Sequence, residues 1–130
     1  MVLLNIDVPD LAVAERFYVD AFGLAVGRRL GADVLELLGW PVPLYLLRKE
    51  AGTIGAGGQA RSYERHWTPV HIDVVVADLD AATVQAARAG AEVEHGPRDA
   101  AFGRMARLAD PFGNGFCLIE FSGRGYDALT

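Results

Sequence analysis

The chain carries one structural plan twice, and this internal repeat limits its fold more than any other feature. Placing Asp10 over Asp78 aligns the segment LLNIDVPDLAVAERFYVDAFGLAV with HIDVVVADLDAATVQAARAGAEV, with one residue skipped before Gly23 and Gly90. Each segment opens with a β-branched strand pattern, turns at Asp-Leu and continues through helix-compatible residues to a glycine suited to a helix C-cap. We therefore expect a strand and a helix at the start of each half, with Asp10 and Asp78 as the N-caps.

Three short strand patterns follow each predicted helix. In the first half they are LAVGRRL, DVLELL and VPLYLLR, and in the second half AEVEHG, GRMARLA and NGFCLIEF. Their length and their aliphatic, β-branched and aromatic content are typical of strands. The predicted order is βαβββ in each half, which indicates an α+β fold. On the second helix, Leu79, Val84 and Ala87 are expected to face the sheet.

A chain of 130 residues suits a single domain, which buries roughly two thirds of the surface that its unfolded chain exposes. We expect module 1 at about 1–49, a connecting loop at about 50–66 and module 2 at about 67–123. The connecting loop is rich in Gly and Ala and shows no period, which predicts a long mobile segment. The sequence is equally compatible with a lid and with a plain linker.

Composition excludes several partners. The formal net charge is −5, and no run of Lys and Arg is interleaved with aromatic residues, so we expect no nucleic-acid partner. Cys117 is the only cysteine, which excludes an intrachain disulfide. The first residues carry no signal-peptide pattern, and no apolar stretch approaches the roughly 20 residues that span a bilayer. These features predict a cytoplasmic protein with no membrane partner.

Three segments in this order make the sequence resemble the vicinal oxygen chelate superfamily, the group of glyoxalase I, bleomycin-resistance proteins and extradiol dioxygenases. They are IDVPDLAVAERFYVDAFGL, HIDVVVADLDAATVQAARAGAEV and LADPFGNGFCLIEF, and they cover nearly the whole chain. The resemblance implies two βαβββ modules forming a curled mixed sheet around a shared cleft, commonly within a homodimer. It implies no single reaction, because members include isomerases, lyases, dioxygenases and proteins that sequester antibiotics.

The resemblance also assigns four positions at which metal-dependent members carry ligands. In this chain those positions hold Leu3, Tyr45, His71 and Cys117. Leu3 cannot bind a metal, and catalytic Zn²⁺ normally needs three protein ligands and an open position. We therefore expect no obligatory metal, although Zn²⁺, Ni²⁺, Fe²⁺ or Mn²⁺ stays open as an alternative.

A metal site would use His71 and the thiolate of Cys117, with Asp73 or Asp7 as an unorthodox third ligand, and Glu120 is a further candidate beside His71. By the strand period of two, Glu120 faces the side opposite Cys117, unless a bulge near GNG shifts the register. Cys117 is interpreted as a small buried side chain, because no cation or helix N-terminus visibly lowers the pKa of its thiol.

Strand parity predicts the side chains that line the cleft. His71 and Asp73 share one face of the strand that opens module 2, and Asn5 and Asp7 share the equivalent face in module 1. Asp73 could orient the imidazole of His71 or act as a base, which makes these two residues the catalytic candidates. The alternatives are a structural histidine and an exposed or capping aspartate.

Several aromatic residues complete the expected ligand-binding set. The full set is Asn5, Asp7, Trp40, Tyr45, His66, Trp67, His71, Asp73, Phe102 and Cys117. Aromatic rings with a few polar groups suit a pocket for an organic ligand, and they suit a dimer interface equally well.

The leading hypothesis is a homodimer whose cleft binds a small, partly aromatic organic molecule without an obligatory metal, as in bleomycin resistance. The alternative is a divalent-metal-dependent lyase, isomerase or dioxygenase of the glyoxalase type. A third hypothesis is a protein that only binds a protein partner. The sequence does not name the ligand.

Overall fold

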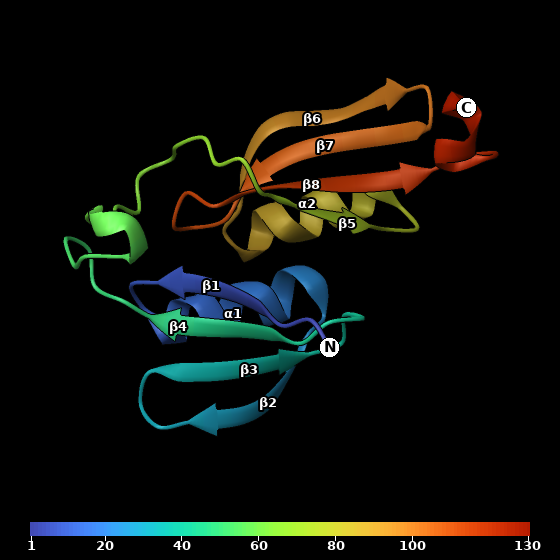
Figure 1. The fold of residues 1–130 in the computed structure, drawn as a ribbon. Coiled ribbons are helices and arrows are strands. Elements are labelled where there is room, and N and C mark those ends of the chain that lie inside the picture. The colour runs from blue at the N-terminus through green and yellow to red at the C-terminus, as the bar shows by residue number, and fades with distance from the viewer. The chain divides into compact units, whose positions relative to one another are not determined.

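The chain folds as two units with the same order of elements (Figure 1), and the computed structural model describes all residues from 1 to 130. Unit 1 is Met1–Glu64 and unit 2 is Arg65–Thr130. Each unit contains one helix and one four-stranded mixed sheet, in the order βαβββ. The predicted α+β fold is confirmed.

Unit 1 contains the following helix and strands: β1 (Leu4–Val8), α1 (Leu11–Phe22), β2 (Ala25–Leu30), β3 (Val34–Leu38) and β4 (Leu44–Arg48). The strand order in the sheet is β1-β4-β3-β2. The outer strand β1 runs parallel to β4, and the other pairs are antiparallel. A short 3₁₀ helix, Ala56–Gly58, follows the sheet.

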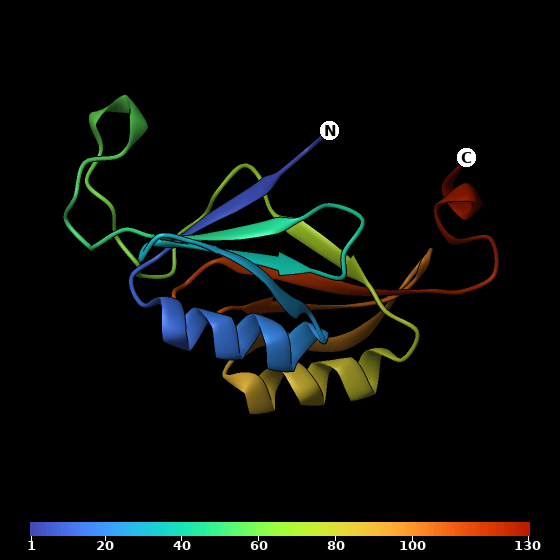
Figure 2. The ribbon, with the colours of Figure 1, turned by 90° about the horizontal axis from the view of Figure 1, so that it is seen from below.

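Unit 2 repeats this plan with β5 (Ile72–Val75), α2 (Leu79–Ala89), β6 (Glu92–Ala100), β7 (Gly103–Ala109) and β8 (Gly115–Phe121). The order is β5-β8-β7-β6, with β5 parallel to β8. A 3₁₀ helix, Gly125–Leu129, ends the chain. In each unit the helix runs along one face of its own sheet (Figure 2), so the other sheet face is available to carry a site.

The predicted caps delimit both helices. Asp10 Oδ1 accepts a hydrogen bond from the backbone N–H of Val13 at 3.0 Å, and Asp78 Oδ1 accepts one from that of Ala81 at 2.9 Å. Gly23 and Gly90 end the helices with φ of 66° and 119°, a conformation that glycine adopts without steric cost. The repeat in the sequence is therefore a repeat of helix start and stop signals.

The buried face of α2 differs from the prediction. Leu79, Thr83 and Ala86 are buried, whereas Val84 is 49% exposed and Ala87 is also exposed. The polar Thr83 occupies the buried face because its hydroxyl donates to the carbonyl of Leu79 at 2.7 Å, which satisfies the group inside the helix. The predicted burial of Leu79 is confirmed, whereas that of Val84 and Ala87 is wrong.

The first part of the predicted connecting loop is hydrogen-bonded to unit 1. A β-bridge joins Ile54 to Ala60, and the backbone N–H of Gly52 donates to the carbonyl of Arg61 at 2.8 Å. Arg61 then reaches β1, where its Nε donates to Asp7 Oδ2 at 2.8 Å. This ion pair connects residues that are far apart in the sequence.

No helix in the structure combines the length and the apolar character that crossing a bilayer requires.

Candidate functional site

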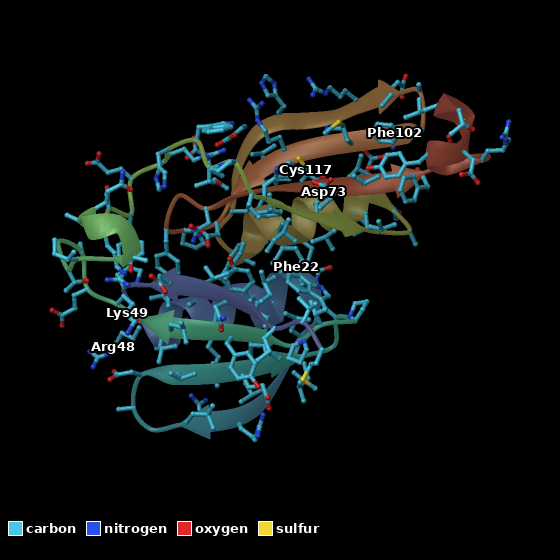
Figure 3. The ribbon with its side chains drawn as sticks, viewed as in Figure 1. Phe22, Arg48, Lys49, Asp73, Phe102 and Cys117 are labelled. Atoms are coloured by element: carbon cyan, nitrogen blue, oxygen red, sulfur yellow. The ribbon has the colours of Figure 1, made fainter.

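Three potential ligand side chains meet on β5 and β8 in unit 2. In the parallel register Asp73 is the partner of Cys117, and His71 lies two residues before Asp73 on the same sheet face. The potential ligand atoms of these three residues all lie within 4.8 Å of one another. Figure 3 shows Asp73 and Cys117 next to each other between the two strands. Strand pairing therefore creates a cluster of one imidazole, one carboxylate and one thiol.

The thiol of this cluster is not an activated nucleophile. Cys117 is 8% exposed, and burial is the main cause that raises the pKa of its thiol. The nearby carboxylate of Asp73 raises this pKa further, whereas Arg107 and Arg98 act weakly in the opposite direction. A neutral thiol is a poor nucleophile, so covalent catalysis by Cys117 is disfavoured.

His71 and Asp73 form the polar side of the cluster. His71 Nε2 lies 3.2 Å from Asp73 Oδ1, and both side chains are partly exposed. The contact is an ion pair only when the imidazole is protonated, and otherwise a hydrogen bond that orients the ring. This geometry suits either a base oriented by a carboxylate or a pair of polar contacts to a ligand.

A hollow of about 210 Å³ opens over this cluster. Its lining includes Arg65, Trp67, His71, Arg107, Phe116 and Cys117, all from unit 2. The indole of Trp67 is 82% exposed, which is uncommon for so large an apolar side chain. Convergent polar groups beside exposed aromatic surface are typical of a site for an organic ligand.

Glu94 links the two arginines that line the hollow. Its carboxylate accepts from Arg65 Nε and, at 3.0 Å, from Arg107 Nε. Hydrogen bonding from Arg65 is the main cause that lowers the pKa of Glu94, so the carboxylate stays ionised. Arg107 is also the cross-strand partner of Cys117, which places it beside the cluster.

Glu120 does not belong to the cluster, although the sequence offered it as a metal-ligand candidate. Its carboxylate accepts from the backbone N–H of Leu79, the first residue of α2, at 2.7 Å. Residues at odd spacing on a strand face opposite sides, so Cys117 and Glu120 project in opposite directions. Glu120 therefore stabilises the start of the helix, where a negative charge is favourable.

In unit 1, the hydroxyl of Tyr45 is hydrogen-bonded to Glu36 and Arg28. The hydroxyl donates to Glu36 Oε2 at 2.5 Å, and Arg28 Nη2 donates to the same carboxylate oxygen at 2.6 Å. These bonds lower the pKa of the buried Glu36 to about 2, with Arg28 as the first cause. Leu3 is 47% exposed and offers no donor. The family's ligand positions in unit 1 therefore hold no metal ligand.

The other predicted site residues lie outside the hollow. Asp7 pairs with Arg61, and Asn5 is exposed on β1. Trp40 packs against Phe22 with ring centroids 5.1 Å apart, and Phe102 packs against Tyr126 at the same separation. His66 is exposed, and its carbonyl accepts from Arg65 Nη1 at 2.5 Å.

Sequence reasoning missed Arg107, which lines the hollow, and Glu94, which pairs with it. Arg107 alternates with buried Ala106 and Leu108 along β7, so strand parity in GRMARLA carried the signal for a residue on the open face. Glu94 gave no comparable signal. Register shifts interrupt the pairing of β6 with β7 between Val93 and His95. Alternation along the strand therefore does not predict which face the Glu94 side chain lies on.

The cluster has the composition of a zinc site. Imidazole nitrogen, carboxylate oxygen and thiolate sulfur are all zinc ligands, and three of them leave a fourth tetrahedral position open. Ligand atoms about 2.0–2.3 Å from Zn²⁺ lie about 3.3–3.8 Å from one another, so the 4.8 Å spread closes by side-chain rotation. His71, Asp73 and Cys117 therefore fit a divalent metal, with every ligand supplied by unit 2.

Two βαβββ modules, each with a mixed sheet and a helix on one face, define a protein of the vicinal oxygen chelate superfamily. Residues 3–119 match the family model described as a glyoxalase-like domain, and the chain belongs to this family.

Solved structures show the same fold at low sequence identity. A glyoxalase/bleomycin resistance protein/dioxygenase family enzyme from Burkholderia phytofirmans PsJN has a TM-score of 0.71 at 17% identity, covering 92% of this chain and 97% of that one. The fosfomycin resistance protein FosX from Listeria monocytogenes has a TM-score of 0.71 at 19% identity, covering 94% and 93%. These similarities establish the fold alone.

Two curated relatives are closer in sequence. The anthracycline biosynthesis protein DauV from Streptomyces sp. (strain C5) is 35% identical over 115 residues, which cover 85% of this chain. The anthracycline biosynthesis protein DnrV from Streptomyces peucetius is 39% identical over 82 residues, or 62% of this chain. The matches span 38% and 27% of those longer proteins.

Proposed function

We propose that the chain binds a small, partly aromatic organic molecule in the hollow of unit 2 and needs no metal to do so. The observation that carries the proposal is the open hollow, which combines the exposed indole of Trp67 with His71 and two arginines. The names of the two curated relatives favour a ligand from anthracycline biosynthesis. Homodimer formation, the shared cleft and a cytoplasmic location stay predictions from the sequence.

Binding is expected to stack the planar part of the ligand on Trp67 and to place its polar groups near His71. An indole supplies a large apolar surface with few rotatable bonds, so ordering it on a ligand costs little conformational entropy. The hollow holds about 210 Å³, which is below the range typical of sites for drug-sized ligands. We therefore expect that part of a larger molecule extends beyond the hollow.

The test is a fluorescence titration in the presence of EDTA. The chain contains two tryptophans, so Trp40→Phe leaves Trp67 as the only indole. This variant is titrated with a panel of aromatic compounds that includes an anthracycline, and calorimetry repeats the binding measurement with Trp67→Ala. A ligand at a hundredfold excess over its Kd also stabilises the fold by about 2.7 kcal/mol.

A matched control for Trp67→Ala is Tyr126→Ala, which removes another exposed aromatic ring of unit 2 that lies outside the hollow. The proposal expects binding in EDTA that weakens in Trp67→Ala and persists in Tyr126→Ala. It fails when no compound binds, or when both variants lose affinity equally.

A metal-dependent enzyme of the glyoxalase type is the second candidate, and the cluster of His71, Asp73 and Cys117 favours it. These three side chains would hold the ion, which would supply Lewis-acid polarisation of a substrate oxygen. The chain's own residues would orient the substrate against Trp67. Deprotonating the buried thiol would make metal affinity rise with pH.

Cobalt titration distinguishes the two candidates without an activity assay. Co²⁺ bound to a thiolate gives a charge-transfer absorption in the near ultraviolet, and elemental analysis after loading with Zn²⁺ gives the stoichiometry. About one ion per chain, lost in both His71→Ala and Cys117→Ser but kept in Glu120→Gln, would overturn the metal-free proposal. Glu120→Gln is the matched control because this carboxylate lies on the opposite face of β8.

A further inference from the structure

The two arginines that line the hollow share one carboxylate. Arg65 Nε and Arg107 Nε both donate to Glu94, and the charges of Glu92 and Asp110 also act on Arg65. Glu94 therefore holds both guanidinium groups in place on one carboxylate.

Arg107 has unused hydrogen-bonding capacity. Its Nε is held by Glu94 at 3.0 Å, whereas neither terminal nitrogen has a hydrogen-bond acceptor in the protein. The side chain is 46% exposed and lines the hollow. A guanidinium fixed through Nε presents its two terminal NH₂ groups as a planar fork, which matches the two oxygens of a carboxylate.

Arg98 adds positive charge from the neighbouring strand β6. The only hydrogen-bond partner of its guanidinium is the weak acceptor Met105 Sδ at 4.0 Å. Its charge acts on Cys117, as does that of Arg107, which lines the hollow. The carboxylate of Asp73, the cross-strand partner of Cys117, pairs with His71.

The guanidinium of Arg65 occupies the space that a side chain at Gly115 would fill. A Cβ atom added at Gly115 would lie 2.5 Å from Arg65 Nη2 and 2.9 Å from its Cζ. The guanidinium therefore packs on the bare backbone at the start of β8, where it reaches Glu94. Arg65 and Glu94 together fix the orientation of Arg107, and we treat both as positioning residues.

We propose that the ligand of this hollow is an organic anion whose carboxylate binds the terminal nitrogens of Arg107, with its planar part against Trp67. This inference rests on the proposed function and specifies the ligand class. A neutral molecule filling the hollow would cover the terminal nitrogens of Arg107 without pairing them, which is unfavourable. A carboxylate forms charge-assisted hydrogen bonds with these nitrogens.

The test compares 1-naphthoate with 1-naphthamide, which have the same ring system and nearly the same size but differ in charge. Both are titrated by calorimetry, in EDTA, into the full chain and into Arg107→Gln. Arg104→Gln is the matched control, because Arg104 lies three residues earlier on β7 and pairs with Asp80 on α2. Gly115→Ala tests the positioning of Arg65.

The inference expects 1-naphthoate to bind at least about tenfold more tightly than 1-naphthamide, since a charge-assisted hydrogen bond contributes about that much. Arg107→Gln should abolish this preference, Arg104→Gln should keep it, and added salt should weaken 1-naphthoate binding alone. Circular dichroism spectra that match those of the unmodified chain would show that each variant folds.

Equal affinities for the two probes, unchanged in Arg107→Gln, would overturn the inference and leave the proposed function standing. The same holds if only neutral compounds of the aromatic panel bind. If neither the probes nor the panel bind, both proposals fail.

Discussion

Replacing Gly115 with alanine probes the site through one added methyl group. Gly115 is the first residue of β8, and its backbone does not require a positive φ, so alanine is compatible with the strand. The added Cβ would lie 2.5, 2.9 and 3.1 Å from Nη2, Cζ and Nη1 of Arg65. Carbon and nitrogen atoms normally pack at about 3.5 Å, so the guanidinium must move by about 1 Å.

The cost of this movement is small for folding and larger for the site. The ion pair between Arg65 and Glu94 is partly exposed and contributes about 1 kcal/mol, and alanine is favoured over glycine in a strand by about 0.5–1 kcal/mol. The two effects oppose each other, so the free energy of unfolding should change by less than about 1 kcal/mol. Displacing Arg65 removes one partner of Glu94, which frees the Arg107 side chain to change orientation.

Urea unfolding followed by circular dichroism gives the stability, and calorimetry with 1-naphthoate gives the affinity. Gly96→Ala is the control, because a Cβ at Gly96 meets no atom within 4 Å. We expect both variants to fold with similar stability and only Gly115→Ala to bind several-fold more weakly. A loss of more than about 2 kcal/mol in Gly115→Ala would refute the reasoning, because Arg65 would then not be free to move.

Substitutions at three further positions test the fold. Gly103→Ala should destabilise by more than about 3 kcal/mol in urea unfolding, because its Cβ would lie 2.1 Å from the carbonyl oxygen of Glu120; a smaller loss would show that the β7–β8 pairing adjusts. Asp78→Ala should cost about 1 kcal/mol through loss of the N-cap, and Asp78→Asn should restore most of it in the same assay. The lowered pKa of Glu36, about 2 against an ordinary 4.5, means that its contribution to stability is complete above pH 4.5 and is lost as the pH falls towards 2. The melting temperature of Glu36→Gln should therefore fall less over this range than that of the unmodified chain, and equal falls would contradict the assignment.

The two candidate functions use the same sheet face in different ways. A metal would be held by His71, Asp73 and Cys117, whereas the anion would bind at Arg107, the cross-strand partner of Cys117. A bound metal could also bind the carboxylate of the ligand. The binding experiments therefore include EDTA, which removes the metal. The cobalt titration and the naphthoate titration then report on separate side chains.

The fold was readable from the sequence because its signals are local. Asp10 and Asp78 mark helix starts, Gly23 and Gly90 mark helix ends, and strand runs follow at short intervals. Each signal acts through a hydrogen bond or a backbone angle within a few residues, so it needs no knowledge of the rest of the chain. The face of α2 was misjudged because Thr83 satisfies its hydroxyl inside its own helix, which hydrophobicity does not express.

The proximity of His71 to Asp73 also followed from the sequence, since residues two apart on a strand share a face. The sequence did not show that the pairing of β5 with β8 brings Cys117 opposite Asp73, or that β7 adds Arg107 next to it. These neighbours come from separate strands, and their register is set by the packing of the whole sheet. Local patterns thus determined the modules, the caps and the strand faces, whereas only the tertiary structure decided which charged side chains meet, because charges interact through space and not along the chain.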